Sequence, residues 1–120
     1  MMSDRAIKLL KKACSEKLSR DEVLSFWEDF RAKFDELYPL ALEMKDCLAK
    51  VIAMGIREVD EDLFLLTYEH DSIRELAYRV VDMMSVELED YVNEIMALNL
   101  ERTPLGSYIM RKLGGRGGGT

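Results

Sequence analysis

His70 is the single histidine of the chain and the residue best suited to proton transfer near neutral pH. Glu69 and Asp71 flank it, and neighbouring carboxylates favour the protonated imidazole. A carboxylate-bridged di-iron site in a helical bundle needs Glu-x-x-His spacing, but position 67 is Thr. We therefore interpret His70 as a residue at a helix end rather than as a catalytic group.

Two groups of acidic residues have the ligand type that divalent cations prefer. They are Asp60–Asp62 and the later set Glu87, Glu89, Asp90 and Glu94. An EF-hand loop starting at Asp60 would need glycine at its sixth position and glutamate at its twelfth, where the chain has Leu65 and Asp71. A metal-dependent enzyme would need the two groups on facing helices. Solvated acidic faces explain them with fewer assumptions, so we predict no bound metal.

Other catalytic patterns do not occur in the sequence. The chain has no Gly-Lys-Ser/Thr phosphate loop, no Gly-x-Ser-x-Gly elbow and no Cys-x-x-Cys pair. Cys14 and Cys47 lie in two segments that both have helical periodicity, and we expect two buried thiols in a reducing compartment. We predict that the protein is not an enzyme, with no cofactor and no small-molecule substrate.

Charge is distributed unevenly along the chain. Residues 1–20 carry six basic and two acidic side chains, and residues 102–120 carry four basic and no acidic ones. Since the whole chain has a net charge of −6, the middle is strongly acidic. Basic ends on an acidic body can contact a polyanion or an acidic protein surface. The candidate contact residues are Arg5, Lys8, Lys12, Arg111, Lys112 and Arg116.

Apolar residues recur at spacings of three and four along most of the chain, which predicts an all-helical fold. A first helix is expected over about residues 4–18. Ser19 and Glu22 form a capping-box pattern, so a second helix should begin at Arg20. Its aromatic stripe includes Trp27 and should face the core, and Pro39 should end or kink this helix.

The third expected helix, over about residues 40–54, is apolar nearly all round. Leu40, Met44, Cys47, Val51 and Met54 form its core stripe. Leu42, Ala49 and Ala53 lie on the opposite side, which predicts a partner-binding face. Gly55 should cap its C-terminus.

The second half of the chain predicts a short helix over about residues 59–70, a long one of about 26 residues starting at a Ser72 capping box, and a short C-terminal one after Thr103-Pro104. Gly114 should end the last helix, with a flexible glycine-rich tail over 114–120. Because this tail holds one Arg-Gly-Gly unit, it resembles RNA-binding repeats only weakly. We predict a four- to five-helix bundle in a single domain, 1–113.

These observations favour a non-enzymatic helical subunit of a larger or self-associating complex. Its contact surfaces would be the apolar third helix and the basic ends, and its partner a protein or another copy. An alternative is a small subunit of a nucleoprotein complex that contacts the phosphate backbone through the basic ends. A metal-dependent enzyme using the acidic groups is the third alternative. The N-terminus has no signal-peptide pattern and no segment could span a membrane, so we expect a soluble cytoplasmic protein.

Overall fold

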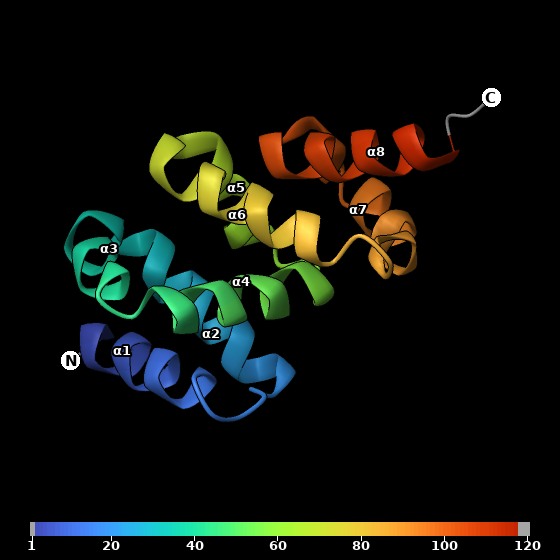
Figure 1. Ribbon diagram of the computed structural model, residues 1–120. Helices are drawn as coiled ribbons and strands as arrows, with labels where there is room; N and C mark the ends of the chain where they lie inside the picture. Colours follow the sequence, from blue (N-terminus) through green and yellow to red (C-terminus); the bar gives the residue numbers. More distant parts are fainter. Residues whose placement is uncertain (1, 118–120) are drawn as a thin grey trace. The chain divides into compact units, whose positions relative to one another are not determined.

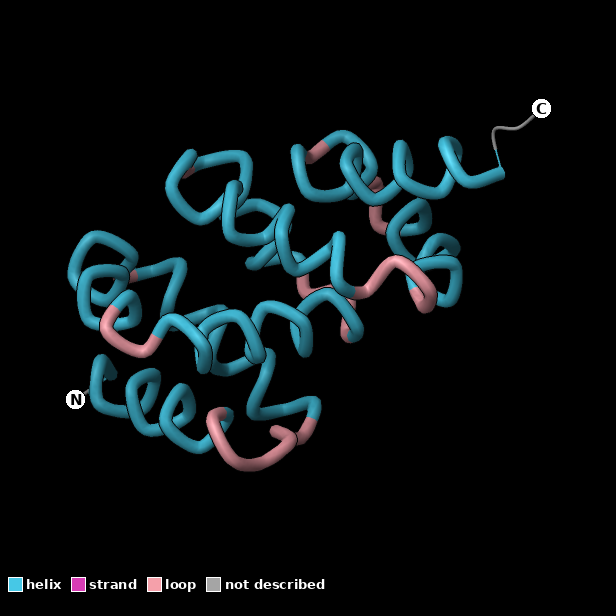
Figure 2. Tube along the Cα trace, viewed as in Figure 1, coloured by secondary structure: helices cyan, strands magenta, loops and turns pink. Residues whose placement is uncertain are grey.

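A computed structural model describes residues 2–117 of the chain, with side chains over 5–114, and this part consists of helices joined by loops and turns, with no strand (Figures 1 and 2). Within it, the α-helices are α1 (Met2–Ala13), α2 (Arg20–Ala32), α3 (Phe34–Leu42), α4 (Lys45–Arg57), α5 (Glu61–Glu69), α6 (Asp71–Met83), α7 (Val92–Ala97) and α8 (Pro104–Gly117). Two 3₁₀ helices, η1 (Leu88–Tyr91) and η2 (Leu100–Arg102), precede α7 and α8. In the described residues, no helix has the length and apolar character needed to cross a membrane.

The all-helical prediction is confirmed, but the expected bundle of four or five helices differs from the structure. The described residues form eight α-helices, most of them of 9 to 14 residues. The chain also divides into two compact units, unit 1 (Met1–Leu63) and unit 2 (Phe64–Thr120). The single domain over 1–113 stays a prediction.

Unit 1 is built around the aromatic stripe of α2. Phe26, Trp27 and Phe30 are at most 1% exposed, and their ring centroids lie 4.9 to 5.5 Å apart. The Trp27 indole also donates a hydrogen bond to the backbone carbonyl of Val51 in α4. This packing confirms that the stripe faces the core, because large buried rings remove the most apolar surface from water.

The N-terminus of α2 is where the local sequence pattern placed it. The backbone N–H of Glu22 donates to Ser19 Oγ, and the backbone N–H of Ser19 donates to the Glu22 carboxylate. The predicted capping box is therefore confirmed. The next helix boundary falls earlier than predicted: Lys33, with φ −125° and ψ 39°, separates α2 from α3, and Pro39 lies inside α3. The prediction that Pro39 ends or kinks the second helix is wrong, because α2 has already ended at Ala32; α3 ends three residues beyond Pro39.

The C-terminus of α4 corrects the predicted role of Gly55. The helix continues past Gly55 to Arg57, and the left-handed residue is Val59, with φ 48°. Backbone hydrogen bonds from Asp60 N to Gly55 O and from Val59 N to Ile56 O form a Schellman cap around it. A Cβ at Gly55 would lie 2.6 Å from the Trp27 Nε1 atom, so this glycine serves close packing rather than capping.

Cys14 and Cys47 are joined by a disulfide bond that connects the end of α1 to α4. Their Cα atoms lie 4.6 Å apart, and Lys50 Nζ donates a hydrogen bond to the Cys14 carbonyl. The expectation of two free buried thiols is therefore wrong. Spacing along the chain gave no signal for this pairing, since it depends on how α1 and α4 pack.

Unit 2 does not contain the predicted long helix over about residues 72–98. The helix α6 begins at Asp71 rather than after Ser72, and it ends at Met83. The chain then folds back through η1 and α7, and Asn99 adopts a left-handed conformation with φ 58°. Leu88 and Ile95 remain buried as the periodicity required. Periodic burial is satisfied equally by one long helix and by short helices that pack on the same core.

Two buried threonines connect the elements of unit 2. Thr103 Oγ1 donates to Leu100 O and accepts from Gly106 N, which confirms the predicted cap of the C-terminal helix. Thr67 Oγ1 donates to Phe64 O in α5 and accepts from Leu105 N in α8. These hydrogen bonds position the first turn of α8.

Gly106 allows a close backbone approach in unit 2. A Cβ at this position would lie 1.9 Å from the backbone oxygen of Leu100, which is far below any tolerable contact. The helix α8 then continues through Gly114 to Gly117. The prediction that Gly114 ends the helix is wrong, and the part of the predicted flexible tail over 118–120 lies outside the described residues.

Candidate functional site

Two of the four basic side chains of α1 form ion pairs with acidic side chains of α2. Arg5 forms two hydrogen bonds of 2.7 Å with the carboxylate of Asp29, which is 1% exposed, and this pairing raises the pKa of Arg5. Lys12 Nζ lies 2.6 Å from Glu22 Oε2, and that hydrogen bond raises the pKa of Lys12 and lowers that of Glu22. Lys8 is exposed. Two of the three predicted N-terminal contact residues thus have partners within unit 1.

The basic side chains of α8 are held in a similar way. Lys112 Nζ and the Tyr108 hydroxyl both bond to Asp82 Oδ1, each at 2.8 Å. The hydrogen bond to Asp82 raises the pKa of Lys112, and its counterpart lowers the pKa of Asp82. The Tyr108 ring stacks on Tyr78 with centroids 4.1 Å apart, and the Arg111 guanidinium lies 5.7 Å from the Tyr108 centroid. These contacts form a charged and aromatic cluster between α6 and α8.

Arg116 completes the predicted basic set, but its side chain lies outside the described side chains. The described basic residues fall into two separate groups. Arg5, Lys8 and Lys12 belong to unit 1, whereas Arg111 and Lys112 belong to unit 2. Within each group, a phosphate would have to compete with a carboxylate that is already bound, which weakens electrostatic attraction.

The predicted apolar face in unit 1 is split between two helices. Leu42 ends α3 and is 41% exposed, whereas Ala49 and Ala53 lie in α4 and are half-buried. The core face of α4 also differs from the predicted stripe. It consists of Leu48, Val51, Ile52, Gly55 and Ile56. Leu40, predicted to be core, is 45% exposed and adds to the accessible apolar surface of α3.

Unit 2 carries a more exposed apolar segment, which the sequence analysis missed. Met83 is 76% exposed at the end of α6, and Val86 is 87% exposed in the connection to η1. Met96 in α7 is 49% exposed. The surface was missed because a continuous helix was predicted here. A helix end and a turn expose side chains that a helix interior would cover.

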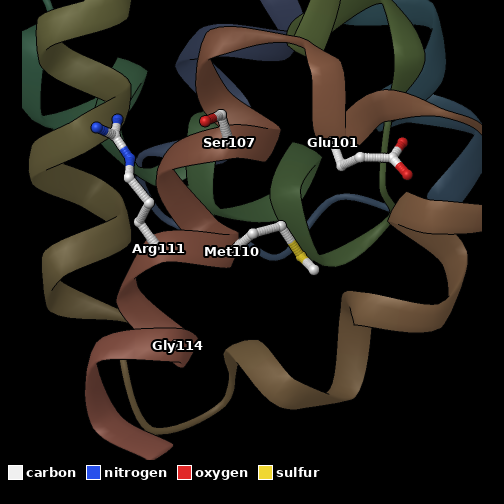
Figure 3. A pocket seen from close by; sticks show the side chains of 5 residues that line it. All are labelled: Glu101, Ser107, Met110, Arg111 and Gly114. Carbon is white, nitrogen blue, oxygen red and sulfur yellow. The ribbon is translucent and has the colours of Figure 1, made fainter. Parts of the chain in front are cut away.

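A groove runs along one face of α8 (Figure 3). It is shallow and open to solvent, with a volume of about 580 Å³. Its lining residues are Glu101 from η2 and Ser107, Met110, Arg111 and Gly114 from α8. The four α8 residues follow the spacing of one helix face, i, i+3, i+4 and i+7. This spacing is the signal in the sequence that could have identified the groove, had α8 not been predicted to end at Gly114.

Glu101 gives the groove its unusual polar group. Its Oε1 atom is buried and accepts no hydrogen bond from any described residue. An unpaired buried carboxylate oxygen is costly, since it has lost hydration without gaining a donor. A ligand that supplies positive charge or a donor would offset this loss.

Asp60 is the second buried acidic residue with an unpaired oxygen. It is 1% exposed; Oδ1 accepts from the backbone N–H groups of Asp62 and Leu63, while Oδ2 has no partner among the described residues. Burial raises the pKa of this carboxyl to about 7. Asp60 thus caps α5 directly after the left-handed Val59.

Of the two acidic groups considered as metal ligands, Asp60–Asp62 belong to unit 1 and the later group belongs to unit 2. Among the side chains described over 5–114, no cluster of three or more His, Cys, Asp or Glu residues could hold a metal ion. Glu87 accepts a hydrogen bond from the Tyr91 hydroxyl at 2.6 Å, and Glu89, Asp90 and Glu94 are exposed. His70 lies in extended backbone directly before α6.

No family model, curated protein or solved structure matches this chain. The functional assignment of the surfaces above therefore depends on their own geometry and chemistry. Three surfaces stand out: the exposed apolar residues after α6, those at the end of α3, and the groove along α8.

Proposed function

We propose that the protein is a non-enzymatic subunit that acts by binding another protein or another copy of itself. The supporting observation is the exposure of Met83 and Val86, two apolar side chains only three positions apart. Single exposed apolar residues are common on protein surfaces, but two in one short segment at a helix end are well placed for burial by a partner. Met is also enriched at the centres of protein interfaces.

Burial of these side chains would contribute favourable free energy to such a contact. Complete burial of a Val or Met side chain contributes about 1.5–3 kcal/mol relative to exposure. Leu40 and Leu42 offer a second, less exposed surface in unit 1, which extends the apolar face predicted from Leu42, Ala49 and Ala53.

The basic residues support a nucleic-acid role less well. Arg5, Lys12 and Lys112 already form ion pairs with acidic side chains of this chain. The overall charge of −6 also opposes association with a polyanion. A protein partner is therefore favoured over nucleic acid, and the experiment must be able to detect either one.

Sedimentation velocity and native mass measurement of the complex purified from its source test the proposal. We expect a mass above 13.9 kDa that reflects protein and no nucleic acid. Met83→Gln combined with Val86→Gln should lower that mass, whereas Leu40→Gln combined with Leu42→Gln serves as the matched pair in unit 1. A monomer with no co-purifying protein would contradict the proposal, and a co-purifying oligonucleotide would favour the nucleoprotein alternative.

A further inference from the structure

We propose that two copies of this chain form a dimer by exchanging the segment over residues 88–117, with residues 84–87 after α6 as the hinge. This inference rests on the proposed function and deepens it, because it names a second copy of the chain as the partner. It depends on three observations within unit 2: the backbone and sequence of the hinge, the contacts between α6 and α8, and the exposed apolar side chains at the hinge.

The first observation is that the backbone around the hinge is already close to helical. Met84, Glu87 and Tyr91 have φ between −107° and −99° and ψ between −6° and 9°. No residue of 84–91 has a positive φ. Rotations of about 35–50° would therefore bring these residues to α-helical values without leaving the right-handed side of φ/ψ space. A straightened hinge would join α6 to η1 and α7 in one helix.

The sequence of the hinge region contains nothing that stops a helix. Residues 71–98 include no glycine and no proline. Val80, Met84 and Leu88 are at most 5% exposed, and their i, i+4, i+8 spacing is that of one helix face. The break after Met83 therefore depends on where the segment beyond it packs and not on the local sequence. When that segment packs on another copy, the local preference for helix and the global fold agree.

The second observation is that α8 is held on α6 by contacts that a second copy offers in identical form. The Tyr108 ring stacks on Tyr78 with centroids 4.1 Å apart, and both Tyr108 and Lys112 bond to Asp82. These contacts are the same whether α8 belongs to the same chain or to another one. Exchange therefore keeps them, and the dimer has to offset only the lost freedom of two chains.

The third observation supplies an additional contact that offsets this loss. Met83 and Val86 are 76% and 87% exposed, and their spacing of three places them on one side of a straightened hinge, away from the buried face of Met84 and Leu88. Four helical residues extend only about 6 Å, so two copies that exchange across them must meet at the hinge. A two-fold axis there sets Met83 and Val86 of both copies against each other, which removes them from water.

Variants of Ser85 test the hinge. Ser85 is the second residue of the turn closed by the hydrogen bond from Glu87 N to Met84 O. Proline suits that position of a turn but interrupts a helix, whereas alanine favours the helix. Sedimentation equilibrium of the full chain should show that Ser85→Ala dimerises at least about 100-fold more tightly than Ser85→Pro, because each dimer contains two hinges.

Ser85→Gly is the further variant that keeps the comparison decisive if Ser85→Pro does not fold, which circular dichroism reports. All three substitutions remove the hydroxyl group, so their differences reflect backbone preference alone. Glycine also disfavours a helix interior, although less than proline does. Ser85→Gly should therefore dimerise about tenfold more weakly than Ser85→Ala.

Isotope-filtered NMR identifies the copy that supplies α8. Equal amounts of ¹³C-labelled and unlabelled wild-type chain are unfolded together in urea and refolded, which gives mixed dimers. In an exchanged dimer, the Tyr78 ring of one copy lies against the Tyr108 ring of the other, so a nuclear Overhauser effect between these rings should cross from the labelled to the unlabelled copy. Ser85→Pro chains mixed in the same way should show no such signal.

The exchange is wrong if the wild-type dimer lacks the cross-copy signal, or if Ser85→Ala dimerises no more tightly than Ser85→Pro and Ser85→Gly. It is also wrong if the native complex holds a single copy of this chain bound to a different protein. In each of these cases the proposed function still stands with another contact. A chain that stays monomeric in every variant and co-purifies with no protein contradicts both the exchange and the proposed function.

Discussion

The two units of this chain stabilise themselves by different means. Unit 1 buries three aromatic rings of α2 and joins α1 to α4 with a disulfide bond. Unit 2 relies on hydrogen bonds from two buried threonines and on short helices that turn back on one another. Its connection after α6 leaves large apolar side chains in solvent. We infer from this comparison that unit 1 supplies most of the stability and that unit 2 carries the more exposed of the apolar surfaces proposed for binding.

The aromatic core offers the strongest test of that division. Trp27 is fully buried, so Trp27→Ala should lower the free energy of unfolding by about 4 kcal/mol through lost burial and a residual cavity. Urea denaturation measures this change. Tyr78→Ala, which removes a half-buried stacked ring from unit 2, is the matched variant and should have a smaller effect, about 1 kcal/mol. Equal losses would contradict the assignment of stability to unit 1.

The disulfide bond should make the next largest contribution. Cys14 and Cys47 are 33 positions apart. A cross-link over that separation lowers the entropy of the unfolded chain, which stabilises the folded state by about 3–4 kcal/mol. Cys14→Ser combined with Cys47→Ser should cost about this much in urea denaturation. Thiol titration under denaturing conditions provides the control. If it detects two free thiols in the oxidised wild type, the bond does not form and the stability comparison must omit it.

Asp60 should make the stability of unit 1 depend on pH. Its folded pKa of about 7 exceeds the usual value near 4, so between these values the folded state holds a proton that the unfolded state has released. Raising the pH through this window should lower the free energy of unfolding by up to about 1.4 kcal/mol per pH unit. Asp60→Asn should reduce this slope, as measured by urea denaturation at pH 5, 6, 7 and 8.

The control for this effect is Asp21→Asn, which changes an exposed carboxylate in the first turn of α2. It should leave the slope intact. A wild-type stability that rises between pH 5 and 7, with no difference in the Asp60→Asn variant, would show that the buried carboxyl does not govern the response.

The smallest expected effect is at the cap of α2. Ser19→Ala removes the side-chain acceptor for the Glu22 N–H and should cost about 1 kcal/mol. Ser15→Ala, at an exposed serine outside the capping box, should be nearly neutral. Thermal unfolding compares the two. Identical melting temperatures for Ser19→Ala and the wild type would mean that the cap is not formed in solution.

Features encoded by a few neighbouring residues were predictable from the sequence. The Ser19 capping box needs only four consecutive residues, and the Thr103-Pro104 start of α8 is equally local. The aromatic stripe was also predictable, since its spacing matches one helix face that can face only the core.

Features that depend on tertiary packing were not predictable in this way. The break after Met83 preserves the periodic burial of Leu88 and Ile95, so the pattern could not reveal it. The Cys14–Cys47 bond requires α1 and α4 to meet, and the pairing of Arg5 with Asp29 requires the same of α1 and α2. The basic residues were therefore identified as candidates without the partners that occupy them.

Gly106 also has a consequence for the ancestry of this chain. No side chain fits where its Cα passes the Leu100 carbonyl, so selection for this fold should eliminate every substitution there. Distant relatives that have lost overall similarity should still keep a glycine seven positions after a residue that tolerates left-handed backbone, as Asn99 does here. A Thr-Pro pair should precede that glycine with one residue between them, as Thr103 and Pro104 do in this sequence. That short signature provides a way to search for descendants of the same fold.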